Sequence, residues 1–265
     1  MKCILFIIIY SMAFSNNIQY YSEEDESFAD IEANDLTFKC RVSGLDNTGD
    51  AVILLHGFPE TSRMWYNLIK VLVKNGYKVI APDQRGYSPG ARPSKVSDYT
   101  IDKLSLDIIR LADKLNFNKF HLIGHDWGSA VGWYLASKYP GRILTWTALS
   151  VPHLDAYKNA VKHDSTQSHK SSYISFFIKP ILPVLYFKIF RNKYLKDIWR
   201  SSNDIEIKKY LEVFQQKGAI RSALNWYRAN INNNDKIGDI YVPTLIIYGK
   251  KDMAIGEKCV DDSEG

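Results

Sequence analysis

The hydrophobic positions of the chain follow two alternating periods. Short apolar runs with the length of buried β-strands occupy residues 36–42, 51–55, 77–81, 120–123, 143–150 and 242–248. The segments between them carry apolar residues three or four positions apart, which is the spacing of one helix face. The clearest such stripe consists of Ile101, Leu104, Ile108, Leu111 and Leu115. Strands that alternate with helices predict an α/β fold with a mainly parallel sheet, flanked by helices on both faces.

The alternation of strands and helices stops after residue 152 and resumes near residue 237. The intervening stretch is aromatic, has helical spacing broken by prolines, and carries an excess of Lys and Arg. We therefore expect a helical cap at 153–236, inserted between a first core part at 36–152 and a second at 237–265.

The first residues have the pattern of a secretory signal peptide. Lys2 precedes an apolar run, and Ala13 and Ser15 are small residues at the −3 and −1 positions of a cleavage site. The run is shorter than the roughly 20 residues that span a bilayer, which disfavours the alternative of an uncleaved anchor. We expect a signal peptide at 1–15, a secreted or secretory-pathway protein, and a solvated acidic linker at 16–35.

Composition and charge exclude several classes of protein. The 265 residues are 46% hydrophobic and 24% charged, which is typical of a globular domain with a sizeable core. The net charge of +5 is modest, and no basic cluster indicates nucleic-acid binding. The three cysteines have neither the number of a disulfide scaffold nor the spacing of metal ligands. We expect no metal, no cofactor and no nucleic-acid partner.

The strongest candidate for chemistry is the turn Gly124-His125-Asp126-Trp127-Gly128, between a predicted strand and a predicted helix. A G-x-nucleophile-x-G turn in this context strains its central residue, and the glycines avoid clashes with neighbouring backbone. The central residue here is Asp126. A carboxylate at a helix N-terminus is favoured as the anion, and it can displace a leaving group on carbon to give an ester. The structural alternative is an ordinary helix-capping aspartate.

Three motifs together resemble the epoxide hydrolase branch of the α/β-hydrolase family: HGFPE at 56–60, DQRGYS at 83–88 and GHDWGSAVGW at 124–133. The resemblance runs from about Ala33 to about Lys258. It implies an α/β-hydrolase fold in which Asp126 is the nucleophile and the backbone N–H groups of Phe58 and Trp127 form an oxyanion hole. It also implies that His56 braces the turn, and for His125 we expect a packing role.

The same resemblance assigns two tyrosines and an acid. Tyr173, in a Y-x-x-x-F context, and Tyr227, in NWYR, match the cap tyrosines that bind the epoxide oxygen and protonate it. A phenol suits this role because it donates a hydrogen bond while staying neutral at pH 7. Asp252 follows the strand-like TLIIYGKK and matches the family's charge-relay acid.

One expected residue has no match. In the family a histidine follows the acid and activates the water that hydrolyses the ester. Only 13 residues follow Asp252, and none of them is histidine. The last strand and helix of the core have no counterpart either, so the chain looks C-terminally truncated relative to the family.

Three functions stay open at this point. The first is an epoxide hydrolase-like enzyme that acts with water on a small lipophilic epoxide, since an aromatic cap predicts an apolar pocket. The second is a haloalkane dehalogenase-like enzyme, although the Phe58 side chain cannot donate a hydrogen bond to a halide. The third is a secreted, non-catalytic protein that binds lipophilic ligands. The apolar stretch 173–190 is expected to line the interface of cap and core, and contact with an anionic membrane is the alternative.

Overall fold

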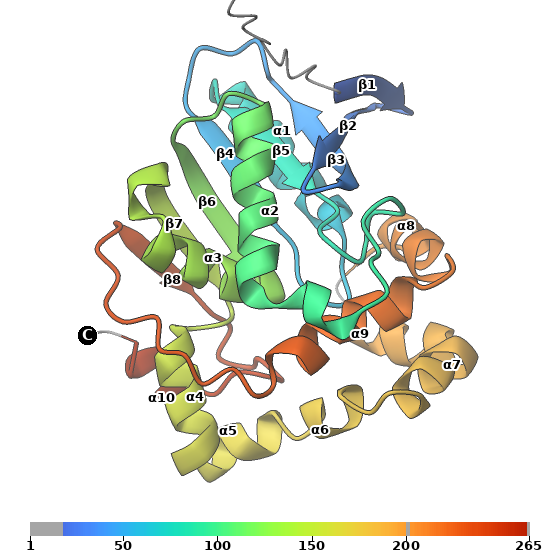
Figure 1. Ribbon diagram of the computed structural model, residues 1–265, viewed down its shortest axis with the longest axis vertical. Helices are drawn as coiled ribbons and strands as arrows, with labels where there is room; N and C mark the ends of the chain where they lie inside the picture. Colours follow the sequence, from blue (N-terminus) through green and yellow to red (C-terminus); the bar gives the residue numbers. More distant parts are fainter. Residues whose placement is uncertain (1–17, 200–201, 264–265) are drawn as a thin grey trace, which may run out of the picture.

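The computed structural model describes residues 18–199 and 202–263, and in this part of the chain one sheet of eight strands forms the core (Figure 1). The predicted signal peptide at 1–15 lies outside the described residues. In spatial order the strands are β1 (Ile18–Glu23), β2 (Glu26–Ala33), β3 (Leu36–Ser43), β5 (Lys78–Pro82), β4 (Ala51–Leu55), β6 (Phe120–His125), β7 (Ile143–Leu149) and β8 (Thr244–Ile247). The strands from β5 to β8 are parallel, and those from β1 to β5 pair antiparallel.

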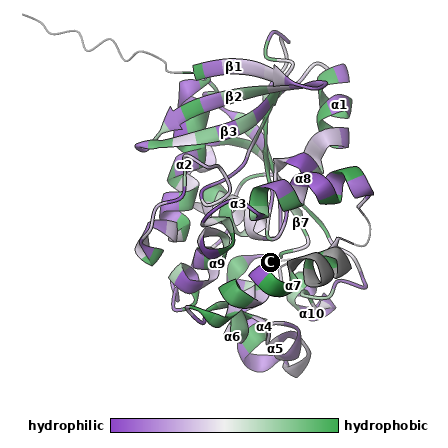
Figure 2. Cartoon of the chain, turned by 90° about the vertical axis from the view of Figure 1, so that its right-hand side faces the viewer, coloured by the Kyte–Doolittle hydropathy of each residue, from purple (hydrophilic) through white to green (hydrophobic). Residues whose placement is uncertain are grey.

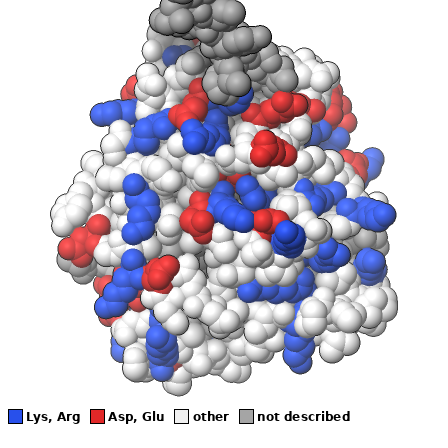
Figure 3. Space-filling view, in the orientation of Figure 1, with Lys and Arg blue, Asp and Glu red and all other residues white. Residues whose placement is uncertain are grey.

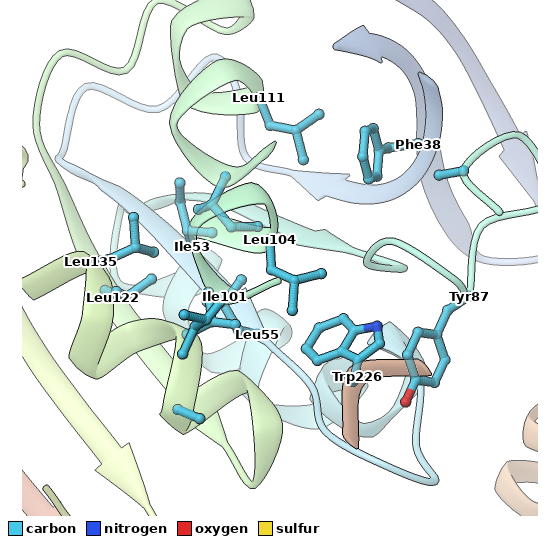
Figure 4. Packing of buried hydrophobic residues seen from close by; sticks show 14 of the residues in the cluster. Phe38, Ile53, Leu55, Tyr87, Ile101, Leu104, Leu111, Leu122, Leu135 and Trp226 are labelled. Atoms are coloured by element: carbon cyan, nitrogen blue, oxygen red, sulfur yellow. The ribbon is translucent and has the colours of Figure 1, made fainter. Parts of the chain in front are cut away.

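Helices cover both faces of the sheet, as its apolar strands require. All five residues of β4 are buried, and they alternate between the two sides. Val52 and Leu54 pack towards α1 (Tyr66–Lys74), whereas Ile53 and Leu55 pack towards α2 (Ile101–Lys114) and α3 (Trp127–Lys138). Figure 4 shows the side of β4 that faces α2 and α3, where Ile53 and Leu55 lie among leucines of these two helices. Strand β4 therefore pairs with β6, the strand before the candidate nucleophile, and packs against α3, the helix after it.

The prediction of a linker at 16–35 is wrong for residues 18–33, which form the β1–β2 hairpin. The acidic run suggested solvent exposure, but Phe28 and Ile31 are buried and fix the hairpin on the sheet. Glu26 is also largely buried, and its carboxylate receives a hydrogen bond from Arg41 Nε at 2.6 Å and pairs with Arg63 through its other oxygen. A carboxylate that neutralises two buried guanidinium groups belongs to the core rather than to a linker.

The chain between β7 and β8 is helical: α4 (Leu154–His163), α5 (Ser165–Lys170), α6 (Ile174–Phe177), α7 (Leu182–Ile198), α8 (Asp204–Phe214) and α9 (Ala219–Asn230). These helices lie beyond the carboxyl ends of the parallel strands (Figure 1). Trp226 of α9 anchors them, because its Nε1 donates to the Arg85 carbonyl at 2.8 Å and its ring is buried. None of the helices that the structure describes is by itself both long and apolar enough to cross a membrane.

After β8 the chain folds back onto the helical layer. The short helix α10 (Glu257–Asp261) packs on α4 through the buried residues Cys259 and Val260. The buried amide of Gln167 bridges the two parts, since Oε1 accepts from Gly256 N at 2.7 Å and Nε2 donates to Ala254 O at 2.8 Å. Strand β8 pairs only with β7 and ends the sheet, with Leu245 and Ile247 about half exposed.

Candidate active site

Asp126 stands in a strained turn between β6 and α3. Its backbone has φ 52° and ψ −119°, a combination that non-glycine residues rarely adopt. The turn is held against the end of β4, where a Cβ on Gly128 would lie 2.2 Å from the Leu55 carbonyl oxygen. Only glycine fits at that position, so the G-x-D-x-G pattern of the sequence is needed to bring α3 this close to the sheet. The strain presents the Asp126 side chain at the carboxyl ends of the strands.

The Asp126 carboxylate lies next to backbone N–H groups. Phe58 N donates to Oδ1 at 2.8 Å, and the N–H of Trp127 also favours the anion. Gly57 allows this approach, because a Cβ there would lie 2.3 Å from the same oxygen. The two N–H groups are placed to stabilise negative charge that develops on this carboxyl oxygen during attack by water on an ester.

Burial outweighs these favourable contacts. It raises the pKa of Asp126 from 3.8 to about 6, against the opposing charge of His125 and the backbone N–H groups of Phe58 and Trp127. At pH 7 a carboxyl of this pKa is still about 90% ionised. The sequence-based expectation of an anion therefore holds at neutral pH, although the helix N-terminus does not keep the pKa low. The desolvated anion is a stronger nucleophile than a hydrated one.

The two predicted tyrosines meet in front of Asp126. Tyr173 immediately precedes α6 and Tyr227 lies on α9, yet their ring centres are 6.3 Å apart. The Tyr227 ring also meets the Trp127 ring edge-on at 5.1 Å. Burial, followed by neighbouring groups that include Asp126, raises the pKa of both phenols well above 10. Both are therefore neutral hydrogen-bond donors at any physiological pH.

Asp126, Tyr173 and Tyr227 line one cavity of about 270 Å³. Its inner walls are apolar and include Trp127, Leu154 and Ile255, whereas Lys and Asn side chains lie among its outer residues. Such a cavity suits a small, mainly apolar molecule that brings one polar atom to the two phenols.

The Phe58 side chain fixes the N–H group that binds Asp126. Its ring makes edge-to-face contacts with four aromatic rings, at centroid distances of 5.6 to 6.0 Å: Phe177, Phe187, Phe214 and Tyr227. All four belong to the helical layer. The contacts that attach the helical layer to the core therefore also hold the Phe58 N–H group next to Asp126.

Asp252 follows β8, in the position that the strand pattern indicated, but its carboxylate is occupied. Oδ2 accepts from Ser150 Oγ at 2.7 Å, and Oδ1 accepts from the backbone N–H groups of Ala254 and Ile255 at 2.8 and 3.0 Å. In the structure Asp252 closes its own loop and ties it to the end of β7. Its role as a charge-relay acid stays a prediction, since no histidine follows it in the sequence.

The histidines near the site have structural partners. His56 is fully buried, with Nε2 accepting from Gln84 N at 3.1 Å and Nδ1 lying 3.0 Å from the Gly57 carbonyl. This bracing matches the predicted role. His125 Nδ1 lies 3.1 Å from Glu60 Oε2. Burial lowers the pKa of His125, but the charges of Glu60 and Asp126 outweigh it, so the net pKa is raised.

Sequence reasoning missed the pairing of Glu60 with His125, although both residues lie inside the quoted motifs. It also missed Tyr157, which lines the cavity and shares a hydrogen bond of 2.9 Å with Ser171. Nothing in the sequence around Tyr157 distinguishes it from the other tyrosines. Among the described residues, no group of three or more His, Cys, Asp or Glu could hold a metal ion.

Comparisons with known proteins agree with this geometry. A family profile described as alpha/beta hydrolase fold matches residues 50–170. An AB hydrolase superfamily protein of Bacillus subtilis is 36% identical over 88% of this chain and 84% of its own length. Epoxide hydrolase 4 of Mus musculus is 32% identical over 76% of this chain, but the chain spans only 59% of that protein. A solved structure of a mutant epoxide hydrolase from Vigna radiata is similar with a TM-score of 0.76 and 27% identity, over 86% of this chain and 81% of that one.

Proposed function

Because the chain belongs to the α/β-hydrolase superfamily, on its epoxide hydrolase branch, we propose that it opens a small lipophilic epoxide through an ester on Asp126. The observation that carries the proposal is the arrangement in one apolar cavity of a largely ionised carboxylate and two neutral phenols. A nucleophile and a pair of hydrogen-bond donors are the two components that ring opening requires.

In the first half-reaction a carboxylate oxygen of Asp126 attacks a ring carbon, and the bond from that carbon to the epoxide oxygen breaks. The electron pair goes to the leaving oxygen, which Tyr173 and Tyr227 stabilise by hydrogen bonds. One phenol then transfers its proton to the alkoxide, because the alkoxide is the stronger base. Solvent returns a proton to the phenolate. The product is a hydroxyalkyl ester of Asp126.

The second half-reaction requires a water molecule that attacks the ester carbonyl. The N–H groups of Phe58 and Trp127 stabilise the resulting oxyanion, but a base must remove a proton from the water. The family supplies this base from a histidine after the acid, and this sequence has no histidine beyond His169. We therefore propose that the 265-residue chain completes ring opening and accumulates the ester. Release of a diol then depends on a histidine supplied from elsewhere.

Intact-mass spectrometry tests this proposal directly. After incubation with a lipophilic epoxide such as styrene oxide, we expect one adduct per chain, with the mass of the added epoxide, on the peptide that contains Asp126. Alkaline treatment should release the adduct as a diol, and the Asp126→Asn variant should form none. Sustained diol production by the purified chain would contradict the accumulation of the ester. Folded protein without an adduct would favour the non-catalytic binding protein, and release of bromide from a bromoalkane would favour a dehalogenase.

The site of action is a further part of the proposal. The sequence at 1–15 supports processing in the secretory pathway, followed by action in its lumen or outside the cell. A fusion of these residues to a reporter enzyme should be secreted, and a fusion that starts at Asn16 should stay in the cell.

A further inference from the structure

Helix α7 and the residue before it are apolar on two opposite sides. Phe187 and Leu195 are each 1% exposed, and the Phe187 ring packs on Phe58. Five other large apolar side chains of the same segment face outward, with exposed fractions from 47 to 71%: Ile181, Leu182, Leu185, Ile189 and Phe190. We call these five residues the α7 apolar patch. A helical segment that is apolar on both sides, as most of 182–190 is, is normally buried on both, so the outer side of this segment has no apolar partner among the described residues.

The patch is continuous rather than a scatter of single residues. Ile181, Leu185 and Ile189 follow each other at intervals of four, which places them on one face of the helix. The described residues contain fourteen exposed large hydrophobic side chains in all, so five of the fourteen lie within ten consecutive residues. Isolated exposed apolar residues need no explanation, whereas a contiguous group of this kind marks an interaction surface. The helix faces the viewer in Figure 2, in front of the other helices of the layer.

The charged residues that precede the patch in sequence and interrupt it are all basic. From Ser165 to Phe190 the sequence contains no Asp or Glu, and its three charged residues are lysines. Lys179 and Lys188 are exposed, one just before the patch and one within it. In Figure 3 the lower right of the molecule, where Figure 1 places α7, shows Lys and Arg side chains among uncharged atoms. The partner of this surface should therefore be apolar in its interior and negatively charged at its boundary.

We propose that the α7 apolar patch docks on the surface of an anionic membrane. An anionic lipid layer has both required properties, since acyl chains accept the apolar side chains and the headgroups attract the lysines. The segment lies in the interface rather than crossing it, because the helices Ser165–Phe177 and Leu182–Phe190 are bent by 93° relative to each other and no described helix passes as a span alone.

A second copy of the chain fits the surface less well. In a symmetric dimer through this face, Lys179 and Lys188 of one copy would approach the same residues of the other, with no acidic side chain in the segment to neutralise them. Like charges brought together at an interface oppose association. A membrane meets the same lysines with negative charge.

Docking of α7 would also place the wall of the cavity close to the lipid. Phe177 and Phe187 pack together at 5.5 Å and connect the buried side of the segment to Tyr227, whose ring is 5.2 Å from that of Phe177. The inner side of the segment therefore contacts the candidate site while its outer side contacts the membrane.

Vesicle flotation with the full chain tests the proposal. Phosphatidylcholine vesicles are compared with vesicles in which about one third of the lipid is phosphatidylserine. We expect the parent protein to float with the anionic vesicles. Leu185→Glu combined with Ile189→Glu should reduce the bound fraction at least about tenfold, and Lys179→Glu combined with Lys188→Glu should reduce it to a similar extent. Val71→Glu is the matched control, because Val71 is 56% exposed on α1, and it should bind as the parent does.

The remaining outcomes overturn the proposal. Equal flotation of the parent and both double variants would show that another segment, such as residues 1–17, carries the binding. Equal recovery with neutral and anionic vesicles would remove the role of the lysines. A dimer in solution that Leu185→Glu dissociates, detected by light scattering, would show that a second copy covers the patch. Thermal melting of each variant checks that the fold is retained, which is expected because all five substituted side chains are exposed.

Discussion

The rate of ester formation should depend on pH through the pKa of Asp126. Only the ionised carboxylate can attack an epoxide carbon, and burial raises the pKa of this group from 3.8 to about 6. The two phenols stay protonated across the neutral range, since their pKa values are raised well above 10. The rate should therefore rise with pH through a single midpoint near 6 and reach a plateau above pH 7.

The expected size of the effect follows from the ionised fraction. A carboxyl with a pKa of about 6 is about 91% ionised at pH 7 and about 9% ionised at pH 5, so the rate should fall about tenfold between these values. A solvent-exposed aspartate with a pKa of 3.8 would lose only about 6% of its anion over the same interval. The two cases are easily separated.

The assay is the initial rate of adduct formation on the intact chain, quenched at intervals between pH 4.5 and 8. Epoxide that hydrolyses without protein at low pH is subtracted. The variant His125→Asn provides a sharper test, because it removes a positive neighbour that favours the Asp126 anion. Its midpoint should shift to higher pH. A midpoint below pH 4.5 in the parent, or a rate that increases as the pH falls, would refute the reasoning.

Three further predictions concern the site and the core. Asp126→Asn should raise the free energy of unfolding by about 2–3 kcal/mol at pH 8, because it removes a buried anion whose pKa is raised on folding. This stabilisation should disappear below pH 4, where Asp126 is protonated in both states, and thermal melting at both pH values measures the difference. Tyr227→Phe and Tyr173→Phe should each slow ester formation by about 10- to 1000-fold, and the double variant should be almost inactive; parental rates in both single variants would remove the tyrosines from the mechanism. Glu26→Gln should cost about 3–5 kcal/mol in denaturant unfolding by leaving buried arginines unpaired, whereas Glu23→Gln, at a half-exposed pair with Lys39, should cost less than about 1 kcal/mol.

Most of the parallel core could be predicted from the sequence because its strands are apolar on both faces. The run at 51–55 coincides with β4, and the helical stripe from Ile101 coincides with α2. The helical segment between β4 and β5 is divided into a 3-10 turn at Ser62–Trp65 and α1. Local periodicity does not distinguish these two kinds of helix, since the apolar spacing is nearly the same.

The N-terminal hairpin could not be predicted in the same way. Its acidic residues obscure a short alternation of apolar positions, and the partners that neutralise Glu26 are 15 and 37 residues away. Charge alone indicates solvent exposure unless the fold brings a counter-charge into the core. The pairing is therefore a property of the three-dimensional structure.

In the candidate site, too, the features set by a local sequence pattern could be predicted, and those set by three-dimensional packing could not. Asp126 and its strained turn follow from a local pattern of five residues, and the structure has that turn. The meeting of Tyr173 with Tyr227 depends on the packing of α6 against α9, and its prediction came from the resemblance to a family rather than from periodicity. The raised pKa of Asp126 is a consequence of burial by the whole helical layer, which no local sequence pattern contains.

The position of the β1–β2 hairpin determines how the chain could sit at a membrane. Strand β1 begins at Ile18 and lies at the top of the molecule in both Figure 1 and Figure 2, whereas α7 lies well below it, among the helices of the other half. If the apolar residues at 1–15 stayed attached as an anchor, they would tether the protein by the end that points away from the α7 apolar patch. An upright tethered molecule would then hold the patch off the bilayer. If the leader is removed, the protein is free to turn over, and maturation would then act as the switch between two orientations.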